Sequence, residues 1–521
     1  LALDTALTGL GGGWDYAWSI SPWTVALAVL LAGAALWALA ALPDPVPGPP
    51  GRRVAAVLPL AGLGPALFLH VLAWQNLGWQ AVLGGRSPGQ AFLLVMVANL
   101  AALAAGTAAS LAREVRWPVV GTALAGLAVA VALVGRATVA ATVLGQASAA
   151  VLVVAIVRRA TVPAAAGDRG GAAGLGALTA AWTAGMGLFV LLVFAYYAAY
   201  DVVLPAGNGW LPALAAVLLG LAAAGSMRGR GGQADRASGR ARGRDLVPVG
   251  VGVALLAAPL VSWATAPGPS APVQDEGPAR PVRVLSYNLH FGFDVQGWSD
   301  LEGVARAIEA SGAEVVGLQE VSRGWYVNGA TDMLAWLQRR LRMPYARFAG
   351  ASDAIWGNAL LSRYPIVAGE VVRLPREGVP LRRNALRAEL DLGAGRRLSV
   401  VVTHLHHVEG PDGARVRLAQ VPRLLELVAG RPATVLMGDL NAEPGSAEIG
   451  LLRAAGMADA FTAAGGGPAD APTWPADRPD RRIDWIWLSG DLAATGFAAT
   501  AGTASDHRGI AVTVRPRPAG G

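Results

Sequence analysis

The sequence predicts a multispan α-helical membrane domain followed by an α/β domain. Hydrophobic residues make up 54% of the 521 residues, and the mean hydropathy is +0.45, which is too apolar for a purely soluble chain. Apolar stretches of roughly 20 residues, the length that crosses a hydrocarbon core, recur only up to residue 266. From residue 282 onward, short β-branched runs alternate with segments of helical spacing, which is typical of a mixed α/β domain.

Residues 1–266 contain eight apolar stretches with almost no internal charge, which favours membrane helices over a soluble helical core. The fourth and fifth stretches are separated only by Arg136. A lone histidine, His70, lies near the end of the second stretch. Such a histidine is more often packed in the protein or at the membrane interface than a ligand. The stretches are 22–42, 54–74, 90–112, 118–135, 137–157, 174–199, 210–226 and 246–266.

Loop arginines predict the orientation of these helices. The intervening loops hold only Arg86 and Arg136, and the positive-inside rule places the arginine-rich loops in the cytoplasm. The last helix then runs outward, so the linker 267–281, the α/β domain 282–516 and the tail 517–521 are expected outside the cytoplasm. The prediction is a multi-pass plasma-membrane protein. One helix more or fewer would place the α/β domain on the cytoplasmic side. The arginine-rich loops hold Arg52 and Arg53, Arg113 and Arg116, Arg158, Arg159 and Arg169, and six arginines between 228 and 244.

Charge and cysteine content limit the chemistry. The chain has no cysteine, which excludes disulfides, zinc–thiolate sites and cysteine nucleophiles. Residues 281–521 hold 26 arginines and 25 acidic residues, whereas residues 1–280 hold 16 and 10. A nonspecific nucleic-acid binder carries a basic face, so the near-neutral α/β part makes nucleic acid the less favoured partner. No protein partner can be inferred.

The α/β part is predicted as nine strands and three helices. The strands are short and rich in β-branched residues, and the helices show apolar positions at helical spacing. The expected strands are 282–287, 314–318, 358–361, 367–374, 385–390, 398–402, 434–437, 483–488 and 510–514, and the expected helices are 301–310, 334–341 and 415–428.

Polar residues fall within or just beyond these strands. Strand ends on one edge of packed sheets converge on a cleft, where carboxylate and amide oxygens suit Mg²⁺ or Mn²⁺. Histidines can transfer protons or bind a phosphoryl oxygen there. No serine nucleophile is suitably placed, so the set indicates metal-assisted attack of water on a phosphoester. Each motif alone is more often a turn or cap. The residues are Asn288, Glu320, His404, Asp439, Asn441 and Asp484, with Asp506 and His507 just before the last strand.

The ordered set resembles the endonuclease/exonuclease/phosphatase superfamily, with its DNase I-like and exonuclease III-like fold. The resemblance covers about residues 282–515 and implies a two-sheet β-sandwich flanked by helices in four layers. The motifs are Ser286-Tyr287-Asn288, Gln319-Glu320, Leu361-Ser362-Arg363-Tyr364-Pro365, Thr403-His404-Leu405, Gly438-Asp439-Leu440-Asn441, Arg482-Ile483-Asp484-Trp485 and Ser505-Asp506-His507.

The resemblance also implies a role for each acidic or amide residue. Glu320 is the implied main ligand of Mg²⁺ or Mn²⁺, Asn288 assists it, and Asp506 offers a second metal position. Asp439 would orient or deprotonate the attacking water, and Asn441 would hold the phosphate.

The implied roles of the basic residues leave alternatives open. His507, oriented by Asp484, would stabilise phosphoryl oxygens or act as an acid or base. His404 would contact the scissile phosphate or protonate the leaving group, but the acidic partner that some members supply for it has no counterpart in the sequence. Arg363 would reach phosphate or serve the fold. The family pattern does not require His290 or the pair His406-His407. These histidines are equally expected to line the substrate pocket or to lie in exposed loops.

Three functions compete. The first is a membrane-anchored phosphoesterase acting on a lipid headgroup or another extracytoplasmic phosphoester; its architecture resembles eukaryotic membrane proteins that remodel GPI-anchor lipids. The second is an extracytoplasmic nuclease. The third, a non-catalytic scaffold, is disfavoured because every expected site position is filled. The expected partners are therefore the lipid bilayer and a phosphoester.

Overall fold

The computed structural model describes residues 57–112, 114–161, 171–203, 207–227, 280–466 and 471–517, together with Ala26, Val29, Leu30 and Gly33. The chain divides into two compact units, Leu1–Ala266 and Pro267–Gly521. Nearly all of the first predicted stretch, the whole of the eighth, the arginine-rich segment 228–244 and most of the linker lie outside the described residues.

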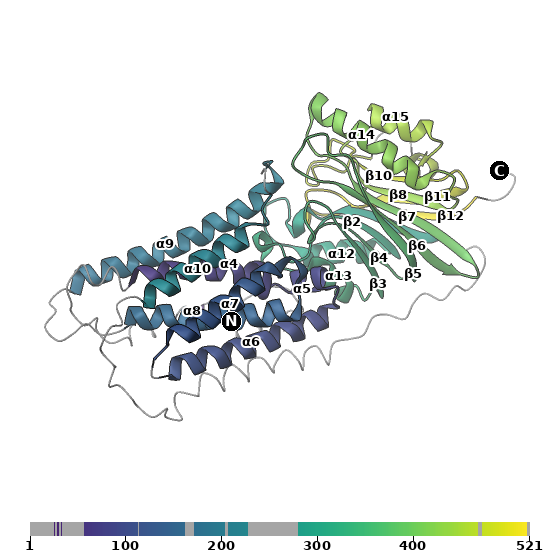
Figure 1. The fold of residues 1–521 in the computed structure, drawn as a ribbon. Coiled ribbons are helices and arrows are strands. Elements are labelled where there is room, and N and C mark those ends of the chain that lie inside the picture. The colour runs from purple at the N-terminus through teal and green to yellow at the C-terminus, as the bar shows by residue number, and fades with distance from the viewer. Residues whose placement is uncertain are drawn as a thin grey trace. The chain divides into compact units, whose positions relative to one another are not determined.

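The described part of the N-terminal unit consists of helices joined by short connections, and six of the eight predicted stretches coincide with helices (Figure 1). Within the described residues, three helices are long and apolar enough to cross a membrane, and a bent pair would add a fourth. Their outer surface carries large apolar side chains, such as Leu191 at 67% exposure and Phe194 at 73%, which suits lipid contact. The helices are η2 (Leu58–Gly62), α4 (Leu63–Leu69), η3 (His70–Trp74), α6 (Pro88–Leu111), α7 (Trp117–Ala132), α8 (Val139–Thr161), α9 (Gly171–Tyr197) and α10 (Leu211–Met227).

One helix of this unit, α5 (Leu77–Gly84), was not expected from the sequence. It follows the π-helical turn η3 across a bend of 51°, and the Asn76 side chain caps it by accepting from Trp79 N. The bend leaves backbone carbonyls without helical partners, and amide side chains satisfy them. Gln80 donates to Ala73 O and Gln146 to Trp74 O, at 2.9 and 2.8 Å.

The C-terminal unit contains two six-stranded sheets. The first has the order β11-β12-β1-β2-β4-β3, and the second β5-β6-β7-β8-β10-β9. Their strands are β1 (Val282–Asn288), β2 (Val315–Ser322), β3 (Tyr345–Gly350), β4 (Trp356–Ser362), β5 (Ile366–Arg373), β6 (Asn384–Gly393), β7 (Arg396–His404), β8 (Thr434–Asp439), β9 (Ala458–Asp459), β10 (Asp484–Leu488), β11 (Leu492–Ala499) and β12 (Ile510–Pro516).

Helices cover the outer faces of both sheets, so the domain has four layers (Figure 1). One apolar core joins the two sheets, with Val284, Val402 and Met437 among its fully buried members. A second core packs α14 and α15 against the second sheet. The predicted two-sheet α/β architecture is therefore confirmed. The covering helices are α12 (Leu301–Ser311), α13 (Met333–Arg340), α14 (Gly410–Val428) and α15 (Ala447–Ala454).

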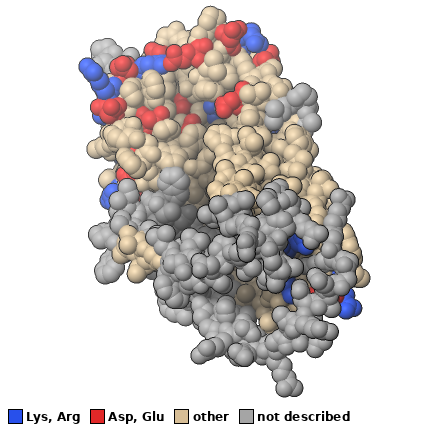
Figure 2. Space-filling view, turned by 90° about the vertical axis from the view of Figure 1, so that its left-hand side faces the viewer, with Lys and Arg blue, Asp and Glu red and all other residues tan. Residues whose placement is uncertain are grey.

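Charged side chains on the face visible in Figure 2 are of both signs and interspersed at the top of the view, over α14 and α15. The described residues visible on this face form no basic stripe of the kind that tracks a nucleic-acid backbone.

Candidate active site

Strand pairing brings the predicted polar residues to one edge of the sandwich. Parallel pairing sets Asn288 of β1 beside Gln319 of β2, next to Glu320. In the second sheet, His404 of β7 pairs with Asp439 of β8, and Asp439 pairs in turn with the first residue of β10, Asp484. Residues far apart in the sequence thus meet because each occupies the end of a buried strand.

These side chains line a cleft of about 500 Å³. Its polar wall combines carboxylates, imidazoles and an amide, as expected of a hydrolytic site. The lining includes Glu320, His404, His407, Asp439, Asn441, Asp506 and His507.

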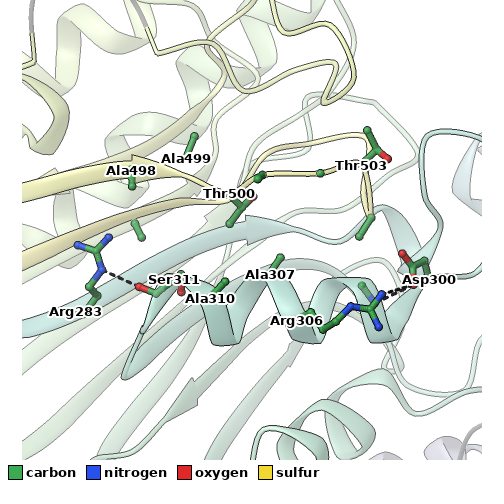
Figure 3. Close-up of a pocket in the computed structure, with 15 residues that line it drawn as sticks. Arg283, Asp300, Arg306, Ala307, Ala310, Ser311, Ala498, Ala499, Thr500 and Thr503 are labelled. Atoms are coloured by element: carbon green, nitrogen blue, oxygen red, sulfur yellow. Dashed lines mark hydrogen bonds and ion pairs between the residues drawn. The ribbon is translucent and has the colours of Figure 1, made fainter.

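A second hollow of similar volume lies between α12 and the residues around Thr500 (Figure 3). Alanine and glycine line most of it. Its two arginines are already bonded, Arg283 to the Ser311 carbonyl and Arg306 to Asp300. It therefore offers no converging reactive groups.

Asp439 is the centre of the site and is almost fully buried. Its Oδ2 accepts from Asn288 Nδ2 at 3.0 Å and lies 3.3 Å from His404 Nε2, while its Oδ1 accepts from Asn441 N. Burial raises its pKa to about 7, with His507 opposing the shift and Asp484 adding to it. A carboxylate whose pKa is raised toward neutrality is suited to accept a proton from water.

Gly438 makes the position of Asp439 possible. It has φ of +155°, and a Cβ here would collide with the Thr403 carbonyl of the neighbouring strand. Only glycine lets β7 and β8 approach so closely just before the site.

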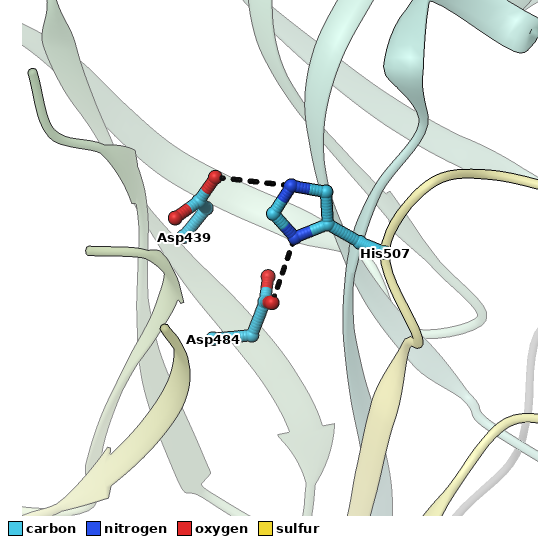
Figure 4. A group of neighbouring side chains, drawn as sticks. All are labelled: Asp439, Asp484 and His507. Atoms are coloured by element: carbon cyan, nitrogen blue, oxygen red, sulfur yellow. Dashed lines mark hydrogen bonds and ion pairs between the residues drawn. The ribbon is translucent and has the colours of Figure 1, made fainter. Parts of the chain in front are cut away.

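His507 lies between two carboxylates (Figure 4). Its Nδ1 is 2.8 Å from Asp484 Oδ2, and its Nε2 is 3.6 Å from Asp439 Oδ2. Burial disfavours the charged ring, but Asp484 and Asp439 outweigh it and raise the pKa of His507 to about 10. His507 is therefore an imidazolium at neutral pH.

His404 has the opposite electrostatic environment. Its Nδ1 faces Arg383 Nη1 at 2.9 Å, and burial together with that guanidinium lowers its pKa well below the usual value. Arg383 is itself buried and lies over the Trp356 ring, 5.4 Å from its centroid. Burial lowers the pKa of Arg383 to about 10, so it remains charged at neutral pH.

Glu320 and Asp506, two of the three predicted metal ligands, both line the cleft. Glu320 has φ of +55° within an irregular stretch of β2, a strained backbone of the kind found at functional sites. Burial raises its pKa and Asp506 raises it further, against Arg383. A cation would relieve this crowding of carboxylates, and the oxygen donors are those that Mg²⁺ prefers.

A tighter group, Asp439, Asp484 and His507, also satisfies the spacing for a metal, with ligand atoms within 4.8 Å of one another. We favour a charge-paired hydrogen bond here. His507 Nδ1 lies at hydrogen-bond distance from Asp484, which leaves no room for an ion between these two atoms.

The remaining predicted residues are placed as follows. Asn441 lines the cleft, and its Nδ2 donates to the Leu405 carbonyl at 3.3 Å. His290 is half-buried near the cleft, with Nδ1 3.8 Å from Asp506 Oδ1. His407 also lines the cleft, whereas His406 is buried behind it and bonded through its backbone to Gln420.

Arg363 does not join this group. It follows the end of β4 that pairs with Val315 at the start of β2, whereas Glu320 lies toward the other end of β2. Arg417 and Arg481 line the cleft, and Arg383 contacts the cleft residue His404; the sequence analysis singled out none of these three arginines. In the sequence, the pair Arg382-Arg383 before a strand is typical of a solvent-exposed surface. The pairing of β6 with β7 brings Arg383 next to His404 in the structure.

The site and the fold together define a phosphoester-hydrolysing domain. Residues 285–507 match the family model described as "Endonuclease/Exonuclease/phosphatase family". The C-terminal domain is therefore similar to that family of enzymes, and the helical unit that precedes it lies outside the match.

Two curated proteins and one solved structure illustrate the similarity. Protein cwh43 of Schizosaccharomyces pombe is 29% identical over 192 residues, 36% of this chain and 18% of that protein. The uncharacterized protein YbhP of Escherichia coli K12 is 28% identical over 249 residues, 44% of this chain and 95% of that protein. The endonuclease/exonuclease/phosphatase from Beutenbergia cavernae is 25% identical, with a TM-score of 0.39, and the match covers 46% of this chain and 72% of that one. This chain thus matches less than a fifth of cwh43.

Proposed function

We propose that this chain is a membrane-anchored, divalent-metal-dependent phosphoesterase whose substrate is a phosphoester at the membrane, with a lipid headgroup as the favoured class. The observation that carries the proposal is the cleft in which Asp439, the Asp484–His507 pair and the Glu320 carboxylate converge. It holds a base, an imidazolium and oxygen ligands for a metal within one site.

Each group has a distinct task in the proposed hydrolysis. Mg²⁺ or Mn²⁺ held by Glu320, with Asn288 and Asp506, would supply Lewis-acid stabilisation of charge on the phosphoryl oxygens. Asp439 accepts the proton of the attacking water, and Asn441 helps hold the phosphate. The His507 imidazolium stabilises the developing negative charge, in a site where such electrostatic effects are strong.

The lipid preference rests on the rest of the chain. The described residues that precede the domain include three apolar helices of spanning length. The domain is near neutral in charge, with 26 arginines against 25 acidic residues in 281–521. The match to cwh43 agrees with the architectural resemblance to proteins that remodel GPI-anchor lipids. An extracytoplasmic position for the domain, expected from the loop arginines, would give it access to outer-leaflet lipids.

The alternative is an extracytoplasmic nuclease, because the same site chemistry would cleave a nucleic-acid phosphodiester. The near balance of 26 arginines and 25 acidic residues in 281–521 counts against it, since phosphate neutralisation supplies most nonspecific nucleic-acid affinity.

The discriminating experiment compares substrates under one set of conditions. Purified full-length protein with Mg²⁺ is assayed on phospholipid vesicles and on plasmid DNA, beside the variant Glu320→Ala. We expect release of phosphorylated headgroup or phosphate from vesicles, absent in Glu320→Ala. Robust DNA cleavage without lipid turnover would refute the lipid assignment and favour the nuclease.

A further inference from the structure

The contact between Arg383 and His404 determines which nitrogen of that histidine carries a proton. A guanidinium has N–H donors and no acceptor. With Arg383 Nη1 2.9 Å from His404 Nδ1, that nitrogen must accept the hydrogen bond. The proton of the neutral ring therefore lies on Nε2, which is 3.3 Å from Asp439 Oδ2, an acceptor.

Arg383 is held in place from several sides. It is 4% exposed, its guanidinium lies over the Trp356 ring, and Nη2 is 3.5 Å from His407 Nδ1. Its Nε is buried and has no hydrogen-bond partner in the part of the chain that the structure describes, and Arg383 does not line the cleft. It thus acts through His404 and does not touch substrate.

Building on the phosphoesterase function proposed above, we propose that Arg383 is a positioning residue that fixes His404 as the Nε2–H tautomer. The single Nε2–H of His404 then donates to Asp439 in this structure and to a phosphoryl oxygen once substrate is bound, and His404 does not protonate the leaving group. A second ring proton would have to lie on Nδ1, which faces the Arg383 N–H donor at 2.9 Å, whereas the nearest carboxylate oxygen, Glu320 Oε1, lies beyond hydrogen-bond distance at 3.9 Å. Loss of the Nε2 proton would leave an imidazolate anion, whose formation is too costly near neutral pH.

The proton balance of hydrolysis can then be written without His404 as a proton donor or acceptor. The bond from water oxygen to phosphorus forms while the bond to the leaving oxygen breaks, and the water proton passes to Asp439. The leaving oxygen takes its proton from His507 or from solvent water. This assignment decides between the two roles, phosphate contact and leaving-group acid, that the family resemblance leaves open for His404.

The tautomer is measurable without any substrate. The chain has six histidines, so ¹⁵N-histidine labelling of the full-length protein in detergent gives six imidazole patterns in long-range ¹H–¹⁵N spectra. The His404 pattern is identified by its loss in His404→Gln. We expect a protonated Nε2 and an unprotonated Nδ1 in the wild type. In Arg383→Met we expect a mixture of the two His404 tautomers. In the control Arg387→Met, which changes an arginine within β6, we expect the His404 pattern of the wild type. A protonated Nδ1 in the wild type would overturn the proposal.

A kinetic arm tests the consequence on aryl phosphodiesters with Mg²⁺. Removing one preorganised donor costs roughly 10²-fold or more in rate, so His404→Ala should lose about that much with 4-nitrophenol and with phenol as leaving groups alike. His404→Gln, which keeps an N–H donor, should recover part of the loss. A loss that is much larger for phenol would mean that His404 protonates the leaving oxygen, against the proposal. An inactive wild type would count against the phosphoesterase function, and the spectra still decide the role of Arg383.

Discussion

At the scale of single residues, the partner of each histidine sets its charge. His507 faces the Asp484 carboxylate and is an imidazolium, whereas His404 faces the Arg383 guanidinium and is neutral. The two rings are close to the same Asp439 oxygen, at 3.6 and 3.3 Å. The site therefore obtains one charged and one neutral donor from the same residue type.

Changing Asp484 to Asn should convert His507 toward a neutral ring, because the carboxylate that outweighs burial is lost. We expect kcat/KM for a phosphodiester to fall by a factor on the order of 10²–10⁴, together with a lower pKa of His507 in ¹⁵N spectra. The control Asp477→Asn changes an exposed acid and should match the wild type. Unchanged kcat/KM in Asp484→Asn would contradict the assigned pair.

His406 predicts a loss of stability in acid. Burial, with His407 and Arg383, lowers its pKa to about 4, below the ordinary 6.5 of the unfolded chain. As the pH falls from about 6.5 to 4, His406 binds a proton in the unfolded state but not in the folded state. The folded state is therefore destabilised relative to the unfolded state. The urea midpoint of the wild type should drop between pH 7 and pH 5, and the drop should be smaller in His406→Gln. An equal drop in both proteins would show that another group is responsible.

At the scale of elements, the buried strands were predictable and the less regular ones were not. The runs 398–402 and 434–437 are β-branched or apolar at every position except Ser399, and they lie in β7 and β8. The strands β3 and β11 are rich in alanine and glycine, and their pairing, not their propensity, makes them strands.

The site was predictable where its residues end such strands, as for Glu320 and Asp439. Arg383 could not be found in the same way, because it depends on the register between β6 and β7 and on burial against Trp356. Arg363 fits the family's motif, but the antiparallel register of β4 with β2 carries it away from the cleft.

Gly438→Ala tests the close approach of β7 and β8. The added Cβ meets the Thr403 carbonyl, so the strand must shift and Asp439 must move with it. We expect the free energy of unfolding to fall by about 1–3 kcal/mol. We also expect the activity to fall by more than the decrease in the folded fraction accounts for. The matched control is Gly450→Ala in α15, where nothing lies within 4 Å and alanine should stabilise slightly. Wild-type stability and activity in Gly438→Ala would contradict the need for glycine.

At the scale of the whole molecule, orientation decides which substrates the cleft can meet. The chain contains no cysteine, so single cysteines can report sidedness without background. In intact cells, a membrane-impermeant maleimide should label Gly297→Cys in the catalytic domain and Arg86→Cys in a predicted outer loop. It should not label Glu114→Cys, in a predicted cytoplasmic loop, until the cells are opened. Labelling of Glu114→Cys but not Gly297→Cys in intact cells would invert the topology.

The central claim is that one metal-dependent cleft performs the chemistry of this chain. It is tested most directly by measuring hydrolysis of bis(4-nitrophenyl) phosphate by the full-length protein with Mg²⁺, with EDTA, and in Glu320→Ala and His507→Ala. We predict hydrolysis with Mg²⁺, abolished by EDTA and restored by added Mg²⁺ or Mn²⁺, and activity reduced by a factor of about 10² or more in both variants. Full activity in EDTA, or in either variant, would contradict the account.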